Sequence, residues 1–285
     1  MNQPTTLVAP RSSPVLQYLP IALLAVGSWA VATSAQAQAT SAQAQATTTM
    51  PGANAGVASP YSLTVGAAVA RLPTYEGSDR SETRALPVIA YRSGRFFAGT
   101  LSGVGYNLSN LANVEFGPVL NYRFGRDESD DVRLRGLGNI DAGVDVGAFV
   151  RWNVQPLSLS ATLEQGVGGN VNGTTVRLNA AYALSINRSN SLRFDALVDW
   201  ADTEVMQGFY GISAPQAARS GLPVYAASSG VRRYGVGAVW AHNITPQWMS
   251  TVRVGVYRLG SEAVDSPLTL RRNVGLVSAG LSYRF

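Results

Sequence analysis

Few side chains in this sequence of 285 residues could act as a catalytic base or nucleophile. There is one histidine, His242, and no cysteine, which excludes a thiolate metal site and a cysteine nucleophile. A histidine base needs a hydroxyl within hydrogen-bond reach, and its nearest candidates, Thr245 and Ser250, are close only in sequence. We therefore expect that the chain is not an enzyme.

Carboxylates are more numerous, but their spacing does not favour catalysis. Asp195 and Asp199 lie four residues apart on a predicted strand, which separates them by about 13 Å, too far to share a proton or a metal ion. The run Asp127–Asp131 could hold a divalent cation loosely, since hard cations prefer carboxylate oxygens. A solvated acidic loop is the more common explanation of such a run, so we expect neither a metal site nor a cofactor.

The basic residues are dispersed along the chain. All 22 are arginine, the net charge is +5, and only Arg232-Arg233 and Arg271-Arg272 are adjacent pairs. Nucleic-acid binding requires a clustered basic face. We therefore expect no nucleic-acid partner.

Most of these charges lie on segments in which apolar and polar residues alternate. Alternation with a period of two predicts strands with unlike faces. The clearest runs are Val114–Phe124, Ile140–Trp152, Val176–Ile186 and Leu192–Trp200. Several exceed the usual strand of about 5–6 residues and match a tilted membrane-crossing strand of about 9–11 residues plus its ends. The pattern predicts an all-β fold, a transmembrane antiparallel β-barrel in contact with outer-membrane lipid.

The carboxy-terminal segment and the aromatic residues support a barrel. Val277, Leu281, Tyr283 and Phe285 form one apolar face that ends on the terminal aromatic ring. This pattern resembles the carboxy-terminal insertion signal of bacterial outer-membrane barrels, with Tyr283 and Phe285 as its key residues. Tryptophans also lie near the predicted strand ends, where an aromatic ring favours the lipid–water boundary.

The amino terminus is predicted to be a targeting segment. Arg11 precedes an apolar stretch and the small-x-small sequence Ala35-Gln36-Ala37, which predicts a signal peptide over 1–37. A tandem repeat leaves cleavage after Ala44 open, and a retained membrane anchor is the less favoured alternative. Residues 38–58 are rich in Ala, Thr and Gln and are expected to be disordered. The barrel is then expected over 59–285, in the cell outer membrane.

Segment lengths predict how the strands are connected. Asn153–Pro156, Asn187–Asn190 and Asn243–Gln247 are short, as periplasmic turns are. The longer connections Gly125–Asn139, Thr203–Gly230 and Ser261–Arg271 are expected to be extracellular. A predicted hairpin of Arg84–Tyr91 and Phe96–Leu101 gives twelve strands, with ten as the alternative.

Charged residues on the polar strand faces are expected to point into the barrel lumen. They are Arg123, Arg151, Arg177, Arg193, Arg253, Glu115, Asp141, Asp145, Glu164, Asp195 and Asp199. The two signs nearly balance, so in a narrow barrel they could pair and block the lumen. A water-filled small-solute pore, with these charges setting its selectivity, is the alternative.

Four short motifs resemble the MipA/OmpV family, the MltA-interacting proteins. They contain Pro73, Tyr75, Gly77, Ser78 and Asp79; Gly136; Gly221 and Pro223; and Asp265, Ser266 and Pro267. The resemblance implies a non-catalytic outer-membrane scaffold that links a murein lytic transglycosylase to a penicillin-binding protein. A narrow solute channel or an adhesin is the alternative. On physical grounds the glycines can also serve turns with positive φ.

Overall fold

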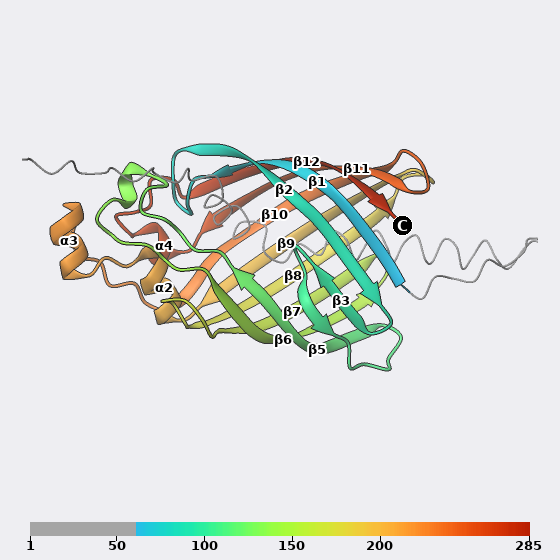
Figure 1. Ribbon diagram of the computed structural model, residues 1–285, viewed down its shortest axis with the longest axis horizontal. Helices are drawn as coiled ribbons and strands as arrows, with labels where there is room; N and C mark the ends of the chain where they lie inside the picture. Colours follow the sequence, from blue (N-terminus) through green and yellow to red (C-terminus); the bar gives the residue numbers. More distant parts are fainter. Residues whose placement is uncertain (1–60) are drawn as a thin grey trace, which may run out of the picture.

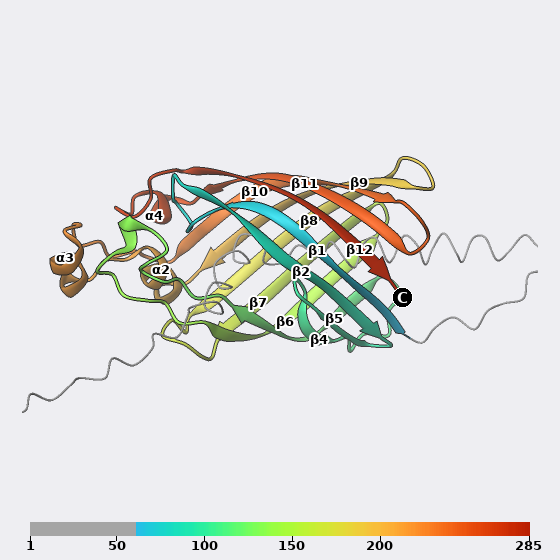
Figure 2. The same cartoon turned by 45° about the horizontal axis from the view of Figure 1, so that its top comes forward.

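The computed structural model describes residues 61–285, which form an antiparallel β-barrel (Figures 1 and 2). The predicted signal peptide and tail lie outside the described residues. Each strand pairs with its neighbours in sequence, and β1 pairs with β12 to close the ring. The strands are β1 (Tyr61–Pro73), β2 (Ser81–Ser93), β3 (Phe96–Gly99), β4 (Gly103–Tyr106), β5 (Val114–Arg123), β6 (Gly143–Val154), β7 (Leu157–Gly166), β8 (Thr174–Ser185), β9 (Asn190–Ala201), β10 (Gly230–Asn243), β11 (Trp248–Leu259) and β12 (Asn273–Arg284).

The described chain thus confirms twelve strands and excludes the alternative of ten. The predicted hairpin exists, but its boundaries were wrong. Its first strand extends to Ser81–Ser93, and its second ends at Gly99 because a turn begins at Thr100. β6 begins three residues later than predicted, since Ile140 forms only an isolated bridge with Arg126.

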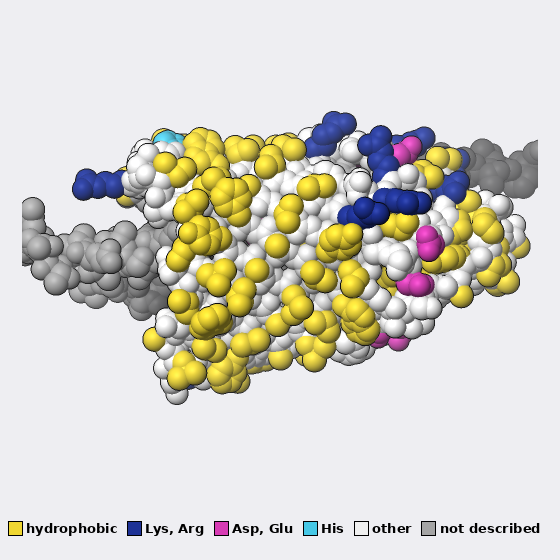
Figure 3. Space-filling view, turned by 180° about the vertical axis from the view of Figure 1, so that it is seen from behind, with side chains coloured by type: hydrophobic (Ala, Val, Ile, Leu, Met, Phe, Trp, Pro, Cys, Tyr) yellow, Lys and Arg dark blue, Asp and Glu magenta, His cyan; other side chains and the backbone are white. Residues whose placement is uncertain are grey.

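Alternation along the strands separates a lipid-facing surface from the lumen. On β6, Val144, Val146 and Val150 are exposed, whereas Phe149 is buried and Asp145 and Arg151 are half-buried. Figure 3 shows the result as a broad band of apolar side chains, with the charged residues gathered mainly toward one end. Exposed valines suit the hydrocarbon region of a bilayer, where apolar surface is favoured.

The two ends of the barrel differ. At the turn end, short connections join the strands, and the carboxy terminus lies there (Figure 1). At the loop end, longer connections carry the 3₁₀ helix η1 (Val132–Leu134) and the helices α2 (Thr203–Tyr210), α3 (Ala214–Ser220) and α4 (Ser261–Val264). Among residues 61–285, no helix is both long and apolar enough to span a membrane.

The last strand carries the predicted insertion signal into the barrel seam. Phe285 donates its backbone N–H to the carbonyl of Leu63 on β1 at 2.9 Å. The Tyr283 ring lies edge-on to Trp248 at 5.1 Å and to Phe285 at 4.8 Å. The terminal aromatic side chains therefore form a ladder at the turn end, beside the closing strand pair.

We predict that Phe285→Ala lowers the amount of folded barrel in the outer membrane. The change removes the terminal ring of this ladder and the aromatic residue that resembles the insertion signal. Folded protein is measured as the heat-modifiable band in outer-membrane fractions. Tyr122→Ala, which removes an exposed ring near the loop end, is the control and should insert normally. Equal levels of both variants would contradict the prediction.

Candidate functional site

The predicted motifs come together at the loop end. We call the connections 74–80, 124–142, 202–229 and 260–272 the loop cap. A buried apolar cluster of Tyr75, Leu134, Leu137, Ile212 and Leu268 joins all four connections. The motifs therefore meet in one packed structure, although they are separated by many residues in sequence.

The motif after β1 is held by polar contacts within this cap. The Tyr75 hydroxyl donates to the carbonyl of Leu268 at 2.9 Å, and burial raises the pKa of the Tyr75 hydroxyl far above its ordinary value. Asp131 accepts from the Thr74 and Ser78 hydroxyls at 3.1 and 3.4 Å. Gly77 has φ of +98°, where a Cβ would approach Thr269 Oγ1 to 2.8 Å, so a glycine is required there.

Other motif residues serve the cap in the same way. Gly136 donates its N–H to Glu128 at 3.0 Å, and Gly221 ends α3 in the left-handed conformation. Ser266 Oγ donates to the carbonyl of Tyr210 at 2.6 Å, and the Pro267 carbonyl accepts from Arg133 Nε at 3.1 Å. Pro73 is buried at the end of β1, whereas Asp79, Pro223 and Asp265 are exposed. Nothing in the structure explains the residue type at these last three positions.

The acidic loop also serves the cap. Asp130 accepts the N–H of Asp127 at 2.8 Å, and Asp131 caps η1 by accepting the N–H of Arg133 at 3.0 Å. These carboxylates thus bind backbone donors of their own loop. Within residues 61–285, no group of three or more possible metal-binding side chains lies together.

A buried carboxylate, Glu76, connects the cap to the lumen. It accepts hydrogen bonds from Arg232 Nε at 2.8 Å, from Arg233 Nη1 at 2.5 Å and from the Tyr210 hydroxyl at 2.6 Å. Burial alone would raise the pKa of Glu76, but the two guanidinium groups and the Tyr210 hydroxyl outweigh it and hold that pKa below its ordinary value. Glu76 is therefore a buried, charged anchor.

Sequence reasoning missed this anchor. Alternation would place one of Arg232 and Arg233 outside, but a β-bulge between Val231 and Arg233 turns both side chains inward. The adjacent arginines, close to Gly230, are the sequence signal that could have indicated this bulge. Glu76 stands between the motif residues Tyr75 and Gly77 but is not one of them, so matching the motif gives it no weight.

From Glu76 a row of contacts crosses the inner wall of the barrel. Arg233 Nε donates to Asp199 at 2.7 Å, Arg177 Nε donates to Asp199 at 3.0 Å, and Arg177 Nη1 donates to Glu164 at 3.1 Å. Glu164 in turn accepts from the Asn121 amide. We call this series, from Glu76 to Asn121, the charge chain. It links the loop cap to β10, β9, β8, β7 and β5.

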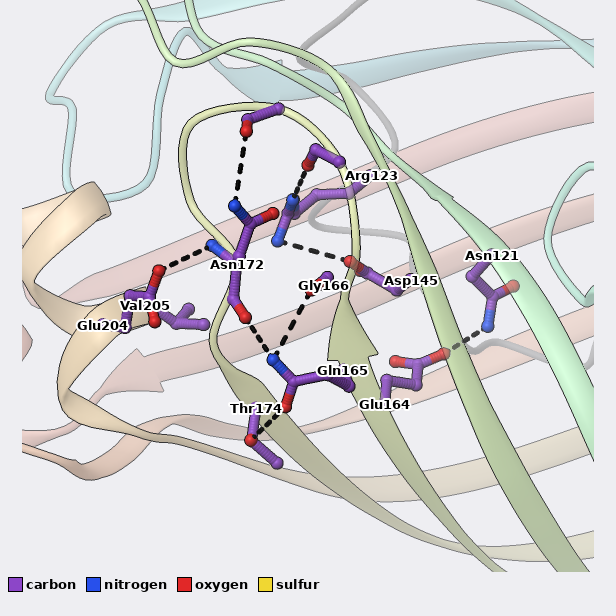
Figure 4. Close-up of polar contacts among 12 residues, drawn as sticks. Asn121, Arg123, Asp145, Glu164, Gln165, Gly166, Asn172, Thr174, Glu204 and Val205 are labelled. Atoms are coloured by element: carbon purple, nitrogen blue, oxygen red, sulfur yellow. Dashed lines mark hydrogen bonds and ion pairs between the residues drawn. The ribbon is translucent and has the colours of Figure 1, made fainter.

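Some further ion pairs lie beside the charge chain, and others lie nearer the turn end. Arg123 contacts Asp145 at 3.3 Å and donates to the Gly168 carbonyl at 2.6 Å; Figure 4 shows Arg123 beside Asp145 and Asn121 beside Glu164. Arg253 pairs with Asp195 at 3.0 Å. Toward the turn end, Glu115 accepts from both Arg92 at 3.1 Å and Arg151 at 2.6 Å.

Two of the predicted lumen charges need separate mention. Arg193 lies half-buried on β9, on the same strand face as the inward Asp195 and Asp199. Asp141 does not lie in the lumen. It is exposed in the loop before β6, because that strand begins only at Gly143, so its placement in the lumen was wrong.

His242 has no geometry for a nucleophile–base pair. Its ring stacks on Trp240 at 5.7 Å, and its Nδ1 lies 3.0 Å from the Asn190 side-chain oxygen. The Ser250 hydroxyl points to the backbone carbonyl of His242 and not to its imidazole. The polar contacts of the described chain thus hold the cap and pair charges along the inner wall, and His242 is not aligned with a nucleophile.

We predict that Arg233→Ala strongly destabilises the barrel. Arg233 is 1% exposed and bonds both Glu76 and Asp199, so its loss removes one arginine partner from each of two buried carboxylates. Breaking a buried ion pair in this way costs about 3–5 kcal/mol. The midpoint of heat unfolding, followed on gels, should fall. Arg188→Ala, in an exposed turn, is the control, and equal midpoints for the two variants would exclude the predicted role of Arg233.

We predict an acid-dependent effect of Glu76→Gln. Because the folded-state pKa of Glu76 lies below the ordinary value of 4.5, its stabilising effect is complete above pH 4.5 and is lost as the pH falls through the folded-state pKa. The variant should therefore be less stable than the parent at neutral pH, and the difference should shrink in acid. Heat-unfolding midpoints over a pH series measure this difference. A difference that stays constant with pH would count against a charged Glu76.

Comparison with known proteins is consistent with this geometry. Escherichia coli K12 MltA-interacting protein is 27% identical over 238 residues, covering 81% of this chain and 94% of the relative. The E. coli K12 protein named "Putative outer membrane protein YiaT" is 28% identical over 243 residues, covering 83% and 95%. Among solved structures, KdgM porin covers 78% of this chain and 99% of its own, with 8% identity and a TM-score of 0.39. That structural similarity is too low to bear on function.

The family comparison covers the whole described barrel except its first residues. The family model for MltA-interacting protein MipA matches residues 65–285, which include the four motifs, the loop cap and the charge chain. Together with the barrel architecture, this match places the protein in the outer membrane. The chain belongs to the MltA-interacting protein (MipA) family.

Proposed function

We propose that this barrel is a non-catalytic scaffold that links a murein lytic transglycosylase to a penicillin-binding protein. The observation that carries the proposal is the charge chain under the loop cap, which pairs opposite charges along the inner wall of the barrel. We infer that these paired charges close the lumen, so that the barrel acts through its surfaces. The name of the relative, MltA-interacting protein, supports a transglycosylase partner.

The proposal requires a face that reaches the wall. We assign the turn end to the periplasm and the loop end to the exterior, because periplasmic turns of outer-membrane barrels are short. The carboxy terminus lies at the turn end (Figure 1), as this orientation requires. The cap that contains the four motifs then lies away from the wall, so we infer that the motifs serve the fold and the turn end binds the partner.

Two turns at that end lie side by side and expose a mixed surface. Asn243 donates its N–H to the Ser189 carbonyl at 2.8 Å, which joins the β8–β9 and β10–β11 turns. Ile186 in the first turn and Ile244 in the second are 60% and 55% exposed. Arg188, also in the first turn, is exposed as well. Exposed isoleucines beside an arginine suit a protein partner with an acidic rim.

Not every arginine near this end is available. Arg92 pairs with Glu115 and lies 6.0 Å from the Phe97 ring, so its charge serves the lumen. Arg95 is exposed, although its guanidinium contacts the Asn110 side chain. Arg95 and Arg188 are therefore the better targets for a test of partner binding.

We predict that Arg95→Ala combined with Arg188→Ala inserts normally but captures less lytic transglycosylase. Charges at the rim of an interface mainly speed the association of two proteins, and salt screens them. The loss of captured transglycosylase should therefore be modest and should shrink at high salt. Capture is measured by pull-down from solubilised envelope. Deletion of the α3 helix Ala214–Ser220, which buries no side chain, is the control at the opposite end and should not alter capture. Loss of capture in the deletion alone would refute the proposed binding face.

The alternative of a narrow solute channel requires the charge chain to open. We predict that the purified barrel gives no steady conductance steps in planar bilayers. The Arg177→Ala variant removes the guanidinium group that bridges Glu164 and Asp199. It is expected to show steady or brief conductance steps. Steady steps in the parent protein would favour the channel over the scaffold.

A further inference from the structure

Two charged side chains lie on the outer wall of the barrel, on either side of β12. Arg71 on β1 stands between Ala70 and Leu72, which are both buried, so alternation along the strand turns it outward. Arg258 on β11 likewise stands between two buried residues, and both arginines are exposed. The other outward positions on the strands of residues 61–285 carry no arginine, aspartate or glutamate. The pair is therefore a local feature of one side of the wall.

The pair marks the loop-end border of the lipid-facing band. One outward position nearer the turn end, Val69 on β1 and Val256 on β11 are exposed, and the exposed Val277 on β12 lies opposite Arg71. Figure 3 shows arginine side chains gathered beside the apolar band near one end. A charge that faces lipid is costly at the bilayer midplane and costs little near the bilayer surface. Arg71 and Arg258 therefore belong at the level of the lipid headgroups.

An open stretch of β12 separates the two arginines. Asn273 pairs with Arg258, and Val277 pairs with Arg71, so Gly275 lies between them. A Cβ added at Gly275 would meet no atom within 4 Å, so the wall is bare at this exposed position. Four residues along β12 and two strand spacings put the two arginine Cα atoms about 16 Å apart. The arginines thus flank an open floor on which one large headgroup can lie.

More arginines lie above this floor, at the edge of the loop cap. Arg272 lies beside the end of β11, since its carbonyl accepts from Leu259 N at 2.9 Å. Arg271 lies beside the first loop, since its N–H donates to the Gly77 carbonyl at 2.9 Å. Arg80 follows that loop directly, and all three arginines are exposed. They extend the positive charge from the strands into the adjoining connections.

These five arginines give the border an excess of positive charge. The exposed carboxylates in the same two connections are only Asp79 and Asp265. Within residues 61–285, the five side chains form no ion pair or hydrogen bond, whereas the inward Arg177 and Arg233 are paired. We call the following residues the arginine border: Arg71, Arg80, Arg258, Arg271 and Arg272, with Gly275 as its floor. Its charge favours an anionic partner in the headgroup layer.

We propose that the arginine border binds a phosphorylated glycolipid of the outer leaflet. A guanidinium group can hold a phosphate by two parallel hydrogen bonds, so Arg71 and Arg258 can each hold one phosphate of a disaccharide that carries one at either end. The acyl chains then lie along the exposed valines toward the turn end. The inference uses the orientation proposed above, in which the loop end faces the exterior, but it does not depend on the scaffold role.

Lipid A, a disaccharide lipid with two phosphates, is the probe for a direct test. It is added to the full-length barrel in dodecyl maltoside, and native mass spectrometry measures the bound fraction. The double variant Arg71→Gln with Arg258→Gln should bind lipid A about tenfold more weakly or worse than the parent, because hydrogen bonds to charged groups are the strong ones. Arg135→Gln with Arg219→Gln removes the same charge from exposed cap positions outside the border and should bind like the parent.

A second variant tests the site without removing charge. Gly275→Leu fills the open floor where a Cβ meets no protein atom, so it should keep the heat-modifiable band of the parent and still bind less lipid A. Parent-like binding by either border variant would overturn the proposed site. An equal loss in the Arg135, Arg219 control would mean unspecific charge attraction and would also overturn it. Displacement of lipid A by an equal concentration of inorganic phosphate would assign the border to a soluble anion and would refute a lipid site.

Discussion

The structure depends on one buried carboxylate held between two arginines. Glu76 comes from the first loop, and Arg232 and Arg233 come from a β-bulge at the start of β10. An unpaired charge at this depth would be very costly, so each partner is needed by the others. Because Arg233 also bonds Asp199, the same contact fixes the loop cap above and the charge chain below. Cap and lumen are therefore one polar structure, and the apolar cluster around Tyr75 closes over it.

Much of the fold could be predicted from the sequence. Alternation along segments such as Val114–Phe124 requires unlike faces, and strand length separates a membrane barrel from a soluble sandwich. The ion partners inside the lumen could not be predicted, since alternation gives the face of a residue but not its neighbour across the barrel. Asp141 was misplaced for a related reason, because alternation continues past the end of the hydrogen-bonded strand.

The helices of the loop cap were also missed, although their signals are present. Asp202 caps α2 by accepting from Val205 N at 3.0 Å, and Gln216 accepts from Ser213 N at 2.9 Å at the start of α3. Gly221 then ends α3. Ser213, Gln216 and Gly221 form a readable start and stop pattern. A long polar connection between barrel strands needs no helix, so these signals alone do not predict one. Glu76 was missed because its importance comes from partners more than 130 residues away.

That separation in sequence has a consequence for how the protein assembles. The Tyr75 hydroxyl bonds a carbonyl 193 residues later, and Glu76 bonds an arginine 157 residues later. Closing loops of this length costs conformational entropy, and contacts that are so distant in sequence form slowly by themselves. The barrel strands reduce that cost, since the pairing of β1 with β12 holds the two ends of the chain together. The contacts of the cap therefore depend on ring closure, and in an open ring Arg232, Arg233 and the apolar loop residues would be left without their partners.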